Sequence, residues 1–357
     1  MKIGIVGLPN AGKTTLFNAL TLAGAETAIY PFTTVDENVA MVPVPDDRLD
    51  PVAQAAGASP VVPEMVEFHD IAGLVRGASE GEGLGNRFLA AIRETDAICH
   101  VVRAHGDEGV PHPEGGVGPL RDAEIVEAEL RQADLETALA RFDRVAKQAN
   151  SGDKAAIAER DWLAAVAEAL RRGEPVRSVA VPGAAPDAAR ELQALTSKPV
   201  LYVANTDEGE AAAPEALEQL AGDRGAAAVA VSARIESELA ELGGDDAAEM
   251  RGELGVSEPS LERLVRAAYD LLGLITFFTA HAGAEARARA LREGATAWDA
   301  AGRVHSDIQA GFVRAEVIGW SELVDAGGYA AARERGILRT EGRDYVVADG
   351  DVITIKH

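Results

Sequence analysis

Cysteine, aromatic residues and long apolar runs are all scarce in this chain. Its 357 residues include one cysteine, and aromatic side chains make up 4% of the total. A single cysteine can form neither an intramolecular disulfide nor a cysteine-based zinc site. No apolar run reaches the roughly eighteen residues of a spanning helix, and Met1 leads directly into an apolar segment. We therefore expect a cytoplasmic protein with no membrane span and no signal peptide, long enough for two or three domains.

Basic residues are also in short supply. The chain has 34 Lys and Arg against 58 Asp and Glu, a net charge of −24. This argues against indiscriminate binding to nucleic acid or acidic membranes, and we expect neither a membrane partner nor sequence-specific DNA binding. Residues 274–357 hold 10 basic and 12 acidic side chains, so nearly all of the negative charge lies before them. If any part meets a polyanion, the C-terminal part is the better candidate.

The clearest motif lies at the N-terminus, where Gly7 to Thr14 matches GxxxxGKT. An apolar run, Met1 to Val6, predicts a buried strand before the motif, and a helix is expected to begin near Thr14. Glycines at both ends of the loop let consecutive N–H groups converge on a phosphate. Lys13 would reach the β- and γ-phosphates, and the Thr14 hydroxyl would ligate Mg²⁺. An accidental glycine-rich turn is the alternative, and the flanking strand and helix argue against it.

Two segments that follow resemble the switch loops of GTPases. Tyr30 to Asn38 reads as a loop in which Thr34, with Thr33 in reserve, would close on Mg²⁺ and the γ-phosphate. Met65 to Asp70 reads as a strand that leads into Asp70-Ile-Ala-Gly73, a DxxG motif. The aspartate would hold a Mg²⁺-bound water, and the Gly73 N–H would sense the γ-phosphate.

The residue after Gly73 bears on the mechanism. Ras-like enzymes have a glutamine there that orients the attacking water, whereas this chain has Leu74. Leucine can neither donate nor accept a hydrogen bond, so any hydrolysis must place its water in another way.

The middle of the chain predicts a helical insertion into a parallel sheet. A further buried strand covers Ala97 to Val102, and a glycine-rich loop with His112 follows it. Between Glu124 and Arg172 the composition predicts two long helices that fold back at Asn150 to Asp153. The stripes expected to form their mutual seam are Leu135, Leu139, Phe142 and Ala146 on the first helix and Leu163, Val166 and Leu170 on the second.

Strand character returns in two further segments that lead into candidate base-reading motifs. Pro199 to Ala204 precedes Asn205-Thr206-Asp207-Glu208, and Ala226 to Val231 precedes Ser232-Ala233. These positions match the NKxD and SA motifs of GTPases. A helix over Glu258 to Leu272 would close this domain.

From Leu274 onward, short strands and turns predict a small α+β unit of about 80 residues. The segments expected as strands are ITFFTA, RARAL, AEVI, DYVV and VITI, with one short helix over Thr296 to Arg303.

The base-reading segment predicts weakened guanine specificity. In NKxD a carboxylate accepts hydrogen bonds from guanine N1–H and the 2-amino group, and adenine has neither donor. Here Glu208 is one methylene longer than aspartate, and Thr206 replaces the lysine that packs on the base. A shifted loop could present Asp207 instead.

Together these segments resemble the YchF-type ribosome-binding ATPases, an Obg-related family. The resemblance is carried by GLPNAGKTTLFNALT, YPFTTVDENVAMVPVPDDRLD, DIAGLVRGASEGEGLGNRFLAAIRETDAICHVVR, HSDIQAGFVRAEVI and DYVVADGDV. It implies an α/β P-loop NTPase with an Obg-type G domain over residues 1–120 and 198–273. A coiled-coil arm would be inserted over 121–197, and an α+β TGS domain would cover 274–357.

The resemblance also assigns roles to individual residues. Thr14 and Thr34 would ligate Mg²⁺, and Asp70 would support the ion through water. Asn10 matches the asparagine that helps bind K⁺ in potassium-stimulated relatives, and His112 falls where the family has a histidine proposed to act in hydrolysis. The nucleotide would be bound by Asn10, Ala11, Gly12, Lys13, Thr14, Thr15, Asn205, Thr206, Glu208, Ser232 and Ala233.

The implied function is slow ATP hydrolysis by a nucleotide-controlled switch that binds the ribosome, as the 50S subunit or the 70S particle. Two alternatives stay open. One is an Obg-type GTPase, which base preference would distinguish. The other is a nucleotide-gated binding module with incidental hydrolysis, which Leu74 keeps open.

Overall fold

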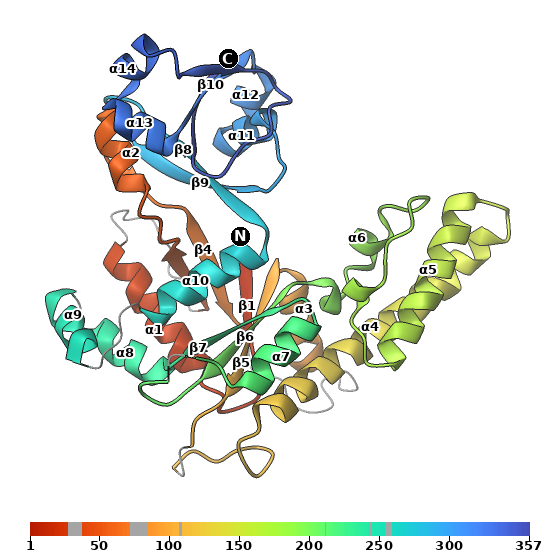
Figure 1. Cartoon of the computed structure of the whole chain (residues 1–357). Coiled ribbons are helices and arrows are strands. Elements are labelled where there is room, and N and C mark those ends of the chain that lie inside the picture. The colour runs from red at the N-terminus through yellow and green to blue at the C-terminus, as the bar shows by residue number, and fades with distance from the viewer. Residues whose placement is uncertain (28–37, 72–83, 107–108, 211, 243, 254–258) are drawn as a thin grey trace. The chain divides into compact units, whose positions relative to one another are not determined.

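The computed structural model describes residues 1–27, 38–71, 84–106, 109–210, 212–242, 244–253 and 259–357 (Figure 1). The chain divides into two compact units. The first unit comprises Met1–Val42 and Glu67–Leu264, and the second comprises Pro43–Val66 and Val265–His357. In the described residues, no helix is both long enough and apolar enough to cross a membrane.

The first unit is built on a six-stranded sheet with the order β2-β4-β1-β5-β6-β7. β1 pairs in parallel with β4 and β5, and the parallel ladder continues through β6 to β7. The strands are β1 (Lys2–Val6), β2 (Val39–Pro43), β4 (Met65–Asp70), β5 (Ala97–Arg103), β6 (Val200–Asn205) and β7 (Ala227–Val231). All five strands predicted for this sheet are therefore confirmed, within a residue or so at their ends.

Helices cover this sheet because its central strands are apolar on both faces. Every residue of β5 and β6 is buried, as expected for a parallel sheet. The described helices from α1 to α10 outside the second unit, not all of which contact the sheet, are α1 (Lys13–Thr27), α3 (Leu84–Arg93), α4 (Pro119–Ala149), α5 (Lys154–Arg171), α6 (Ala188–Leu192), α7 (Glu215–Asp223), α8 (Ala233–Leu242) and α9 (Gly244–Glu253), with 3₁₀ turns η1 (Val176–Ser178) and η2 (Leu195–Ser197). Helix α10 (Ser260–Leu271) begins in the first unit and ends in the second.

Helix α4 belongs to two cores in succession. Its first half places Ala123, Val126 and Leu130 in the core formed with β5, β6, α3 and α7. Its second half packs against α5 in a separate core, in which Val145 and Leu163 are buried. The two helices form the predicted hairpin (Figure 1).

The seam of this hairpin differs from the predicted stripe at two positions, because neither Leu139 nor Ala146 belongs to its core. Leu139 is 39% exposed, whereas Ala138 is fully buried. The α4 residues of this core are Leu135, Ala138, Phe142, Val145 and Ala149. Leu139 and Ala146 were wrongly assigned because the apolar periodicity allows either of two neighbouring residues at each position.

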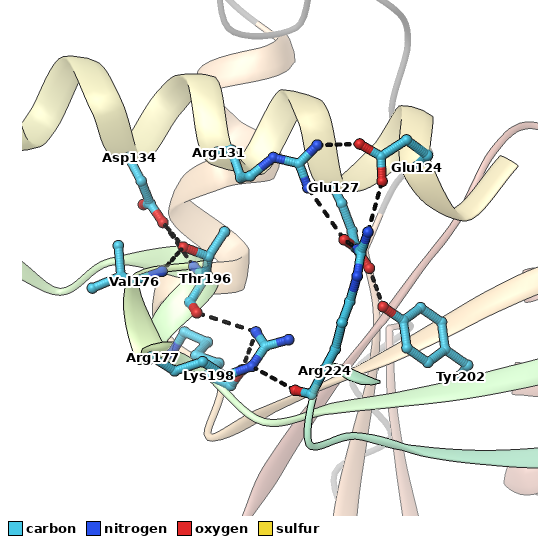
Figure 2. Close-up of polar contacts among 10 residues, drawn as sticks. All are labelled: Glu124, Glu127, Arg131, Asp134, Val176, Arg177, Thr196, Lys198, Tyr202 and Arg224. Atoms are coloured by element: carbon cyan, nitrogen blue, oxygen red, sulfur yellow. Dashed lines mark hydrogen bonds and ion pairs between the residues drawn. The ribbon is translucent and has the colours of Figure 1, made fainter. Parts of the chain in front are cut away.

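The base of α4 is fastened by polar contacts, drawn in Figure 2. Glu127 accepts a hydrogen bond from the Tyr202 hydroxyl on β6 and pairs with Arg224, which lies just beyond α7. Two turns further along α4, Asp134 is 1% exposed and accepts hydrogen bonds from the Leu195 and Thr196 amides at 2.8 and 2.7 Å. These contacts attach α4 to segments more than sixty residues away.

The second unit is a six-stranded mixed sheet with the order β11-β10-β12-β8-β9-β3. One core packs α2 and α13 against it, and another packs α11 against it. The elements are α2 (Leu49–Ala56), β3 (Val61–Val62), β8 (Leu274–Thr279), β9 (Ala286–Arg292), α11 (Ala297–Val304), α12 (Ser306–Ala310), β10 (Arg314–Gly319), α13 (Trp320–Ala326), α14 (Tyr329–Glu334), β11 (Arg339–Glu341) and β12 (Asp351–Lys356).

Two predictions about this unit were wrong. Residues 43–66 were assigned to the nucleotide-binding domain, but they belong to the second unit, as do residues 265–273. β3 pairs with β9, and Val52 of α2 packs with Phe278 of β8, so long-range contacts decide where this segment belongs. The segment DYVV is not a strand, because it contributes only the isolated bridge between Val346 and Thr296.

The contacts of Asp134 generate a prediction about the base of α4. Asp134→Ala would leave three buried donors without their acceptor: the Leu195 amide, the Thr196 amide and the Thr196 hydroxyl. We expect a loss of about 2–4 kcal/mol of local stability. Amide hydrogen exchange at Leu195 and Thr196 measures it directly. Asp143→Ala, an exposed position further along α4, is the control. Unchanged protection at both amides would contradict the assignment.

Candidate functional site

The phosphate loop has the geometry that its sequence predicts. Gly7 has φ +154°, and a Cβ there would lie 2.3 Å from the Val101 carbonyl oxygen. Asn10 adopts a left-handed conformation with φ +63°. Lys13 is buried, and its Nζ donates to the Leu8 carbonyl oxygen at 2.9 Å. The loop therefore curls around the lysine, so that the ammonium group lies within it.

Asn205 connects the phosphate loop to the loop after β7. Its Nδ2 donates to the Ala11 carbonyl oxygen at 3.1 Å, and its Oδ1 accepts from the Ala233 amide at 3.1 Å. Asn205 lies at the end of β6, between β5 and β7 in the sheet. Gly12 must lack a side chain because a Cβ there would lie 2.2 Å from Asn205 Nδ2.

A cavity of about 660 Å³ lies at the carboxyl ends of β1, β5, β6 and β7. The cavity brings together the phosphate loop and the segment that begins at Asn205, which are almost two hundred residues apart in the sequence. Its walls include Asn10, Gly12, Lys13, Thr14, Thr15, Asn205, Thr206, Asp207, Glu208, Ser232 and Ala233. Of the residues predicted to bind nucleotide, Ala11 alone is not in the wall, since it is buried behind it.

Four residues of the cavity wall were missed by the sequence analysis: His105, Gly106, Val110 and Arg234. The first three follow β5, whose carboxyl end lies between those of β1 and β6. Ligands of open α/β sheets bind outside the carboxyl ends of the strands, so the strand order would have indicated this loop. Arg234 directly follows the SA motif, beyond the carboxyl end of β7, so the strand order would have indicated this residue as well.

The loop after β5 is held to the base-reading segment. The Gly106 amide donates to Asp207 Oδ2 at 3.4 Å. The Arg103 guanidinium donates to the carbonyl oxygens of His105 and Val110, at 3.2 and 2.9 Å. Asp207 is therefore engaged by this loop, while Glu208 is exposed in the cavity wall.

The charges of Lys13 and Asp70 each influence the pKa of the other group. Burial lowers the pKa of Lys13, and the charge of Asp70 partly opposes this shift. Burial likewise raises the pKa of Asp70, against the effect of Lys13. A bound phosphate would favour the charged lysine and a bound Mg²⁺ would favour the ionised aspartate, so both groups are suited to a magnesium–nucleotide complex.

His112 is placed apart from the cavity wall. Its ring contacts Asp122 on the first turn of α4 and the Glu114 amide. Its role in hydrolysis stays a prediction. Thr33, Thr34, Gly73 and Leu74 lie outside the described residues.

The residues present fit Mg²⁺ bound together with a nucleotide. Mg²⁺ keeps several waters and takes one or two protein ligands plus phosphate oxygens. Thr14 lies in the cavity wall. Asp70 ends β4 and is in register with Ile5 of β1, which brings it to the same edge of the sheet. Among the residues that the structure covers, no group of three or more His, Cys, Asp or Glu could hold a metal by itself. A metal shared with phosphate needs no such cluster.

This phosphate loop, placed between β1 and α1 and opposite the Asn205 and Ser232-Ala233 loops, defines a P-loop nucleoside-triphosphate-binding domain of the GTPase class. Two family models match the chain. One, described as a 50S ribosome-binding GTPase, matches residues 2–137. The other, YchF-GTPase_C, described as a protein of unknown function, matches residues 274–357.

Similar proteins place the chain more closely. It is 49% identical over 356 residues to the ribosome-binding ATPase YchF of Bacillus subtilis (strain 168), covering 98% of this chain and 97% of that protein. It is 45% identical over 355 residues to the protein of the same name from Escherichia coli O157:H7, covering 99% and 98%. The chain belongs to the YchF family.

Solved structures agree with this assignment. The YchF GTPase of Schizosaccharomyces pombe matches with a TM-score of 0.87 and 33% identity, covering 100% of this chain and 97% of that one. A GTP binding protein from Pyrococcus horikoshii OT3 matches with a TM-score of 0.63 and 23% identity, covering 100% and 99%. The second likeness concerns the fold alone.

The contact between Gly12 and Asn205 generates a prediction. Gly12→Ala would place a methyl group against Asn205 Nδ2 and impose a left-handed backbone on alanine. We expect nucleotide affinity to fall at least tenfold, about 1.4 kcal/mol, as measured by titration with a fluorescent nucleotide. Gly222→Ala, where a Cβ meets nothing within 4 Å, should leave affinity unchanged. Equal affinities in the two variants would show that the close contact between Gly12 and Asn205 does not determine nucleotide binding.

Proposed function

We propose that this protein binds ATP with Mg²⁺, hydrolyses it slowly, and uses the bound nucleotide to control its association with the ribosome in the cytoplasm. The relatives that share 45–49% of its residues carry the name ribosome-binding ATPase over nearly their whole length. The single structural observation that carries the proposal is the cavity that joins the phosphate loop to the altered base-reading segment.

The proposed preference for ATP depends on the segment Asn205-Thr206-Asp207-Glu208. Thr206 is buried and donates to the Glu210 carbonyl oxygen at 3.3 Å, so it cannot pack on a base as the lysine of NKxD does. Asp207 is hydrogen-bonded to Gly106, which leaves Glu208 as the carboxylate available to the base. Because neither the lysine nor the aspartate of NKxD is present in its usual form, we expect the site to bind guanine no better than adenine.

Bound Mg²⁺ would neutralise phosphate charge as the terminal phosphoryl group is transferred to water. Lys13 would bind the phosphate oxygens, Thr14 would hold the metal, and Asp70 and Thr34 would support it. We further propose that K⁺ stimulates the reaction, with the Asn10 side-chain oxygen as one ligand. Asn10 lies in the cavity wall. Its Nδ2 donates to the Pro111 carbonyl oxygen at 3.0 Å, so the side-chain oxygen of Asn10 is not used in that hydrogen bond.

His112 is proposed to orient the attacking water, because Leu74 offers no polar group for that task. A neutral imidazole can accept a hydrogen bond from water near physiological pH. The Gly73 amide would sense the γ-phosphate.

An Obg-type GTPase is the second candidate. The observation that favours it is the name of the Schizosaccharomyces pombe relative, a YchF GTPase. A nucleotide-gated binding module with incidental hydrolysis is the alternative outside the enzyme class.

Base preference is tested by competition. With Mg²⁺ and K⁺ present, ATP should displace a fluorescent nucleotide at least tenfold more effectively than GTP, a difference of about 1.4 kcal/mol. Replacing K⁺ by Na⁺ should slow turnover. A clear preference for GTP would favour the Obg-type alternative.

The role of His112 is tested by His112→Ala in the full chain. We expect ribosome-stimulated ATP turnover to fall at least tenfold, while ATP affinity stays within twofold, since His112 is not in the cavity wall. His305→Ala, at an exposed position in the second unit, is the control. Unchanged turnover in the His112 variant would remove this residue from the mechanism.

A further inference from the structure

The backbone next to His112 is held at the nucleotide cavity. Val110 lies in the cavity wall, and its carbonyl oxygen accepts from Arg103 Nη1 at 2.9 Å. The Pro111 carbonyl oxygen accepts from the side chain of Asn10, a residue of the phosphate loop. His112 therefore starts from a backbone position within reach of the site, although its side chain is not part of the cavity wall.

Both ring nitrogens of His112 are occupied. Nδ1 accepts a hydrogen bond from the Glu114 amide at 3.1 Å, so this nitrogen carries no proton. The proton of the neutral ring must then be on Nε2, which lies 2.8 Å from Asp122 Oδ2 and donates to it. The side chains of His112 and Asp122 are 7% and 3% exposed. In this arrangement the ring can neither accept a hydrogen bond from a water nor donate one to a phosphate.

Asp122 can release His112 without becoming an isolated buried charge. Its second oxygen, Oδ1, accepts from Arg121 Nε and Nη2 at 3.2 and 3.0 Å. Arg121 is in turn held by the Gly116 carbonyl oxygen. Because a buried carboxylate that keeps a cationic partner avoids most of the cost of an unpaired charge, the hydrogen bond to His112 can open and close reversibly.

We propose that the hydrogen bond between His112 and Asp122 is a resting latch that withholds the histidine from bound nucleotide, and that rapid hydrolysis requires this latch to open. The inference rests on the proposed role of His112. Asp122 acts through His112 and touches no nucleotide, so it is a positioning residue.

Helix α4 gives the latch a connection to the helical hairpin. Asp122 lies on the first turn of α4, and the same continuous helix reaches the seam with α5 at Leu135. Between them, Glu127 and Asp134 fasten α4 to β6 and η2 (Figure 2). These contacts resist displacement of α4, so a partner that binds the hairpin would have to strain them before Asp122 moves relative to the loop that carries His112.

The first test is the basal rate of ATP hydrolysis by the full chain without ribosomes. Asp122→Asn keeps the shape of the side chain but replaces a charged acceptor with a neutral one, which weakens the hydrogen bond. We expect basal turnover to rise about three- to tenfold. Asp143→Asn makes the same chemical change at an exposed position of α4 and should leave the rate unchanged. A basal rate that stays the same or falls in a folded Asp122→Asn protein would overturn the latch.

The second test measures the latch itself. Diethyl pyrocarbonate modifies accessible neutral histidines, and peptide mass spectrometry locates the product. In the nucleotide-free protein we expect His112 to react at least tenfold more slowly than His305, whose side chain is 62% exposed. Asp122→Asn should speed the reaction of His112. Equal reactivity of His112 and His305 in every state would show that no latch exists.

A His112→Gln variant separates the two hypotheses. If it retains full turnover, the catalytic role of His112 fails, whatever the labelling shows. If it loses turnover while Asp122→Asn changes neither basal rate nor labelling, the latch alone fails. If both hold, the double variant should be no faster than His112→Gln alone, because Asp122 acts only through the histidine.

Discussion

The two hydrogen bonds of the Asn205 side chain are the constraint on which the nucleotide site depends. They fix the distance between the phosphate loop and the Ser232-Ala233 loop, which are brought together only when β1, β5, β6 and β7 align in one sheet. Asn205 is 6% exposed, so water competes little for either bond. The absence of a side chain at Gly12 makes the approach possible.

Within this frame, the charged groups of the site are held in an environment that favours a ligand. Burial works against the charged forms of Lys13 and Asp70, and each group only partly compensates the other. A magnesium–nucleotide complex supplies opposite charges to both. At the base end of the cavity the side chains are held by backbone groups instead: Thr206 donates to the Glu210 carbonyl oxygen, and Asp207 accepts from the Gly106 amide.

Helix α4 links this site to the helical hairpin. Its sheet-facing half and its α5-facing half belong to different cores, and charged side chains mark the transition between them. These charges are paired rather than isolated: Arg224 contacts Glu124 at 2.9 Å and also pairs with Glu127, while Arg131 pairs with both glutamates (Figure 2). Because partly buried charges are costly without partners, this network favours one position of α4 on the sheet.

The sequence by itself determined the elements and the chemistry that depend on local order. The phosphate loop, five of the six strands of the first unit's sheet, the helical hairpin and the residues Asn205 and Ser232-Ala233 all follow from short patterns in the sequence, whereas β2 was not predicted. Such patterns are informative because apolar periodicity and loop glycines reflect contacts within a few residues. The same reasoning could not distinguish Leu139 from Ala138 at the seam, since both fit the period.

Only the tertiary structure decided matters that depend on long-range contacts. Residues 43–66 join the second unit because β3 finds its partner in β9, more than two hundred residues later. His105 reaches the cavity wall because β5 lies between β1 and β6. His112 is not part of that wall, and its ring is held by Asp122 and the Glu114 amide. Each outcome depends on contacts between segments that are far apart in the sequence. A pattern of neighbouring residues does not specify which distant segment it will contact.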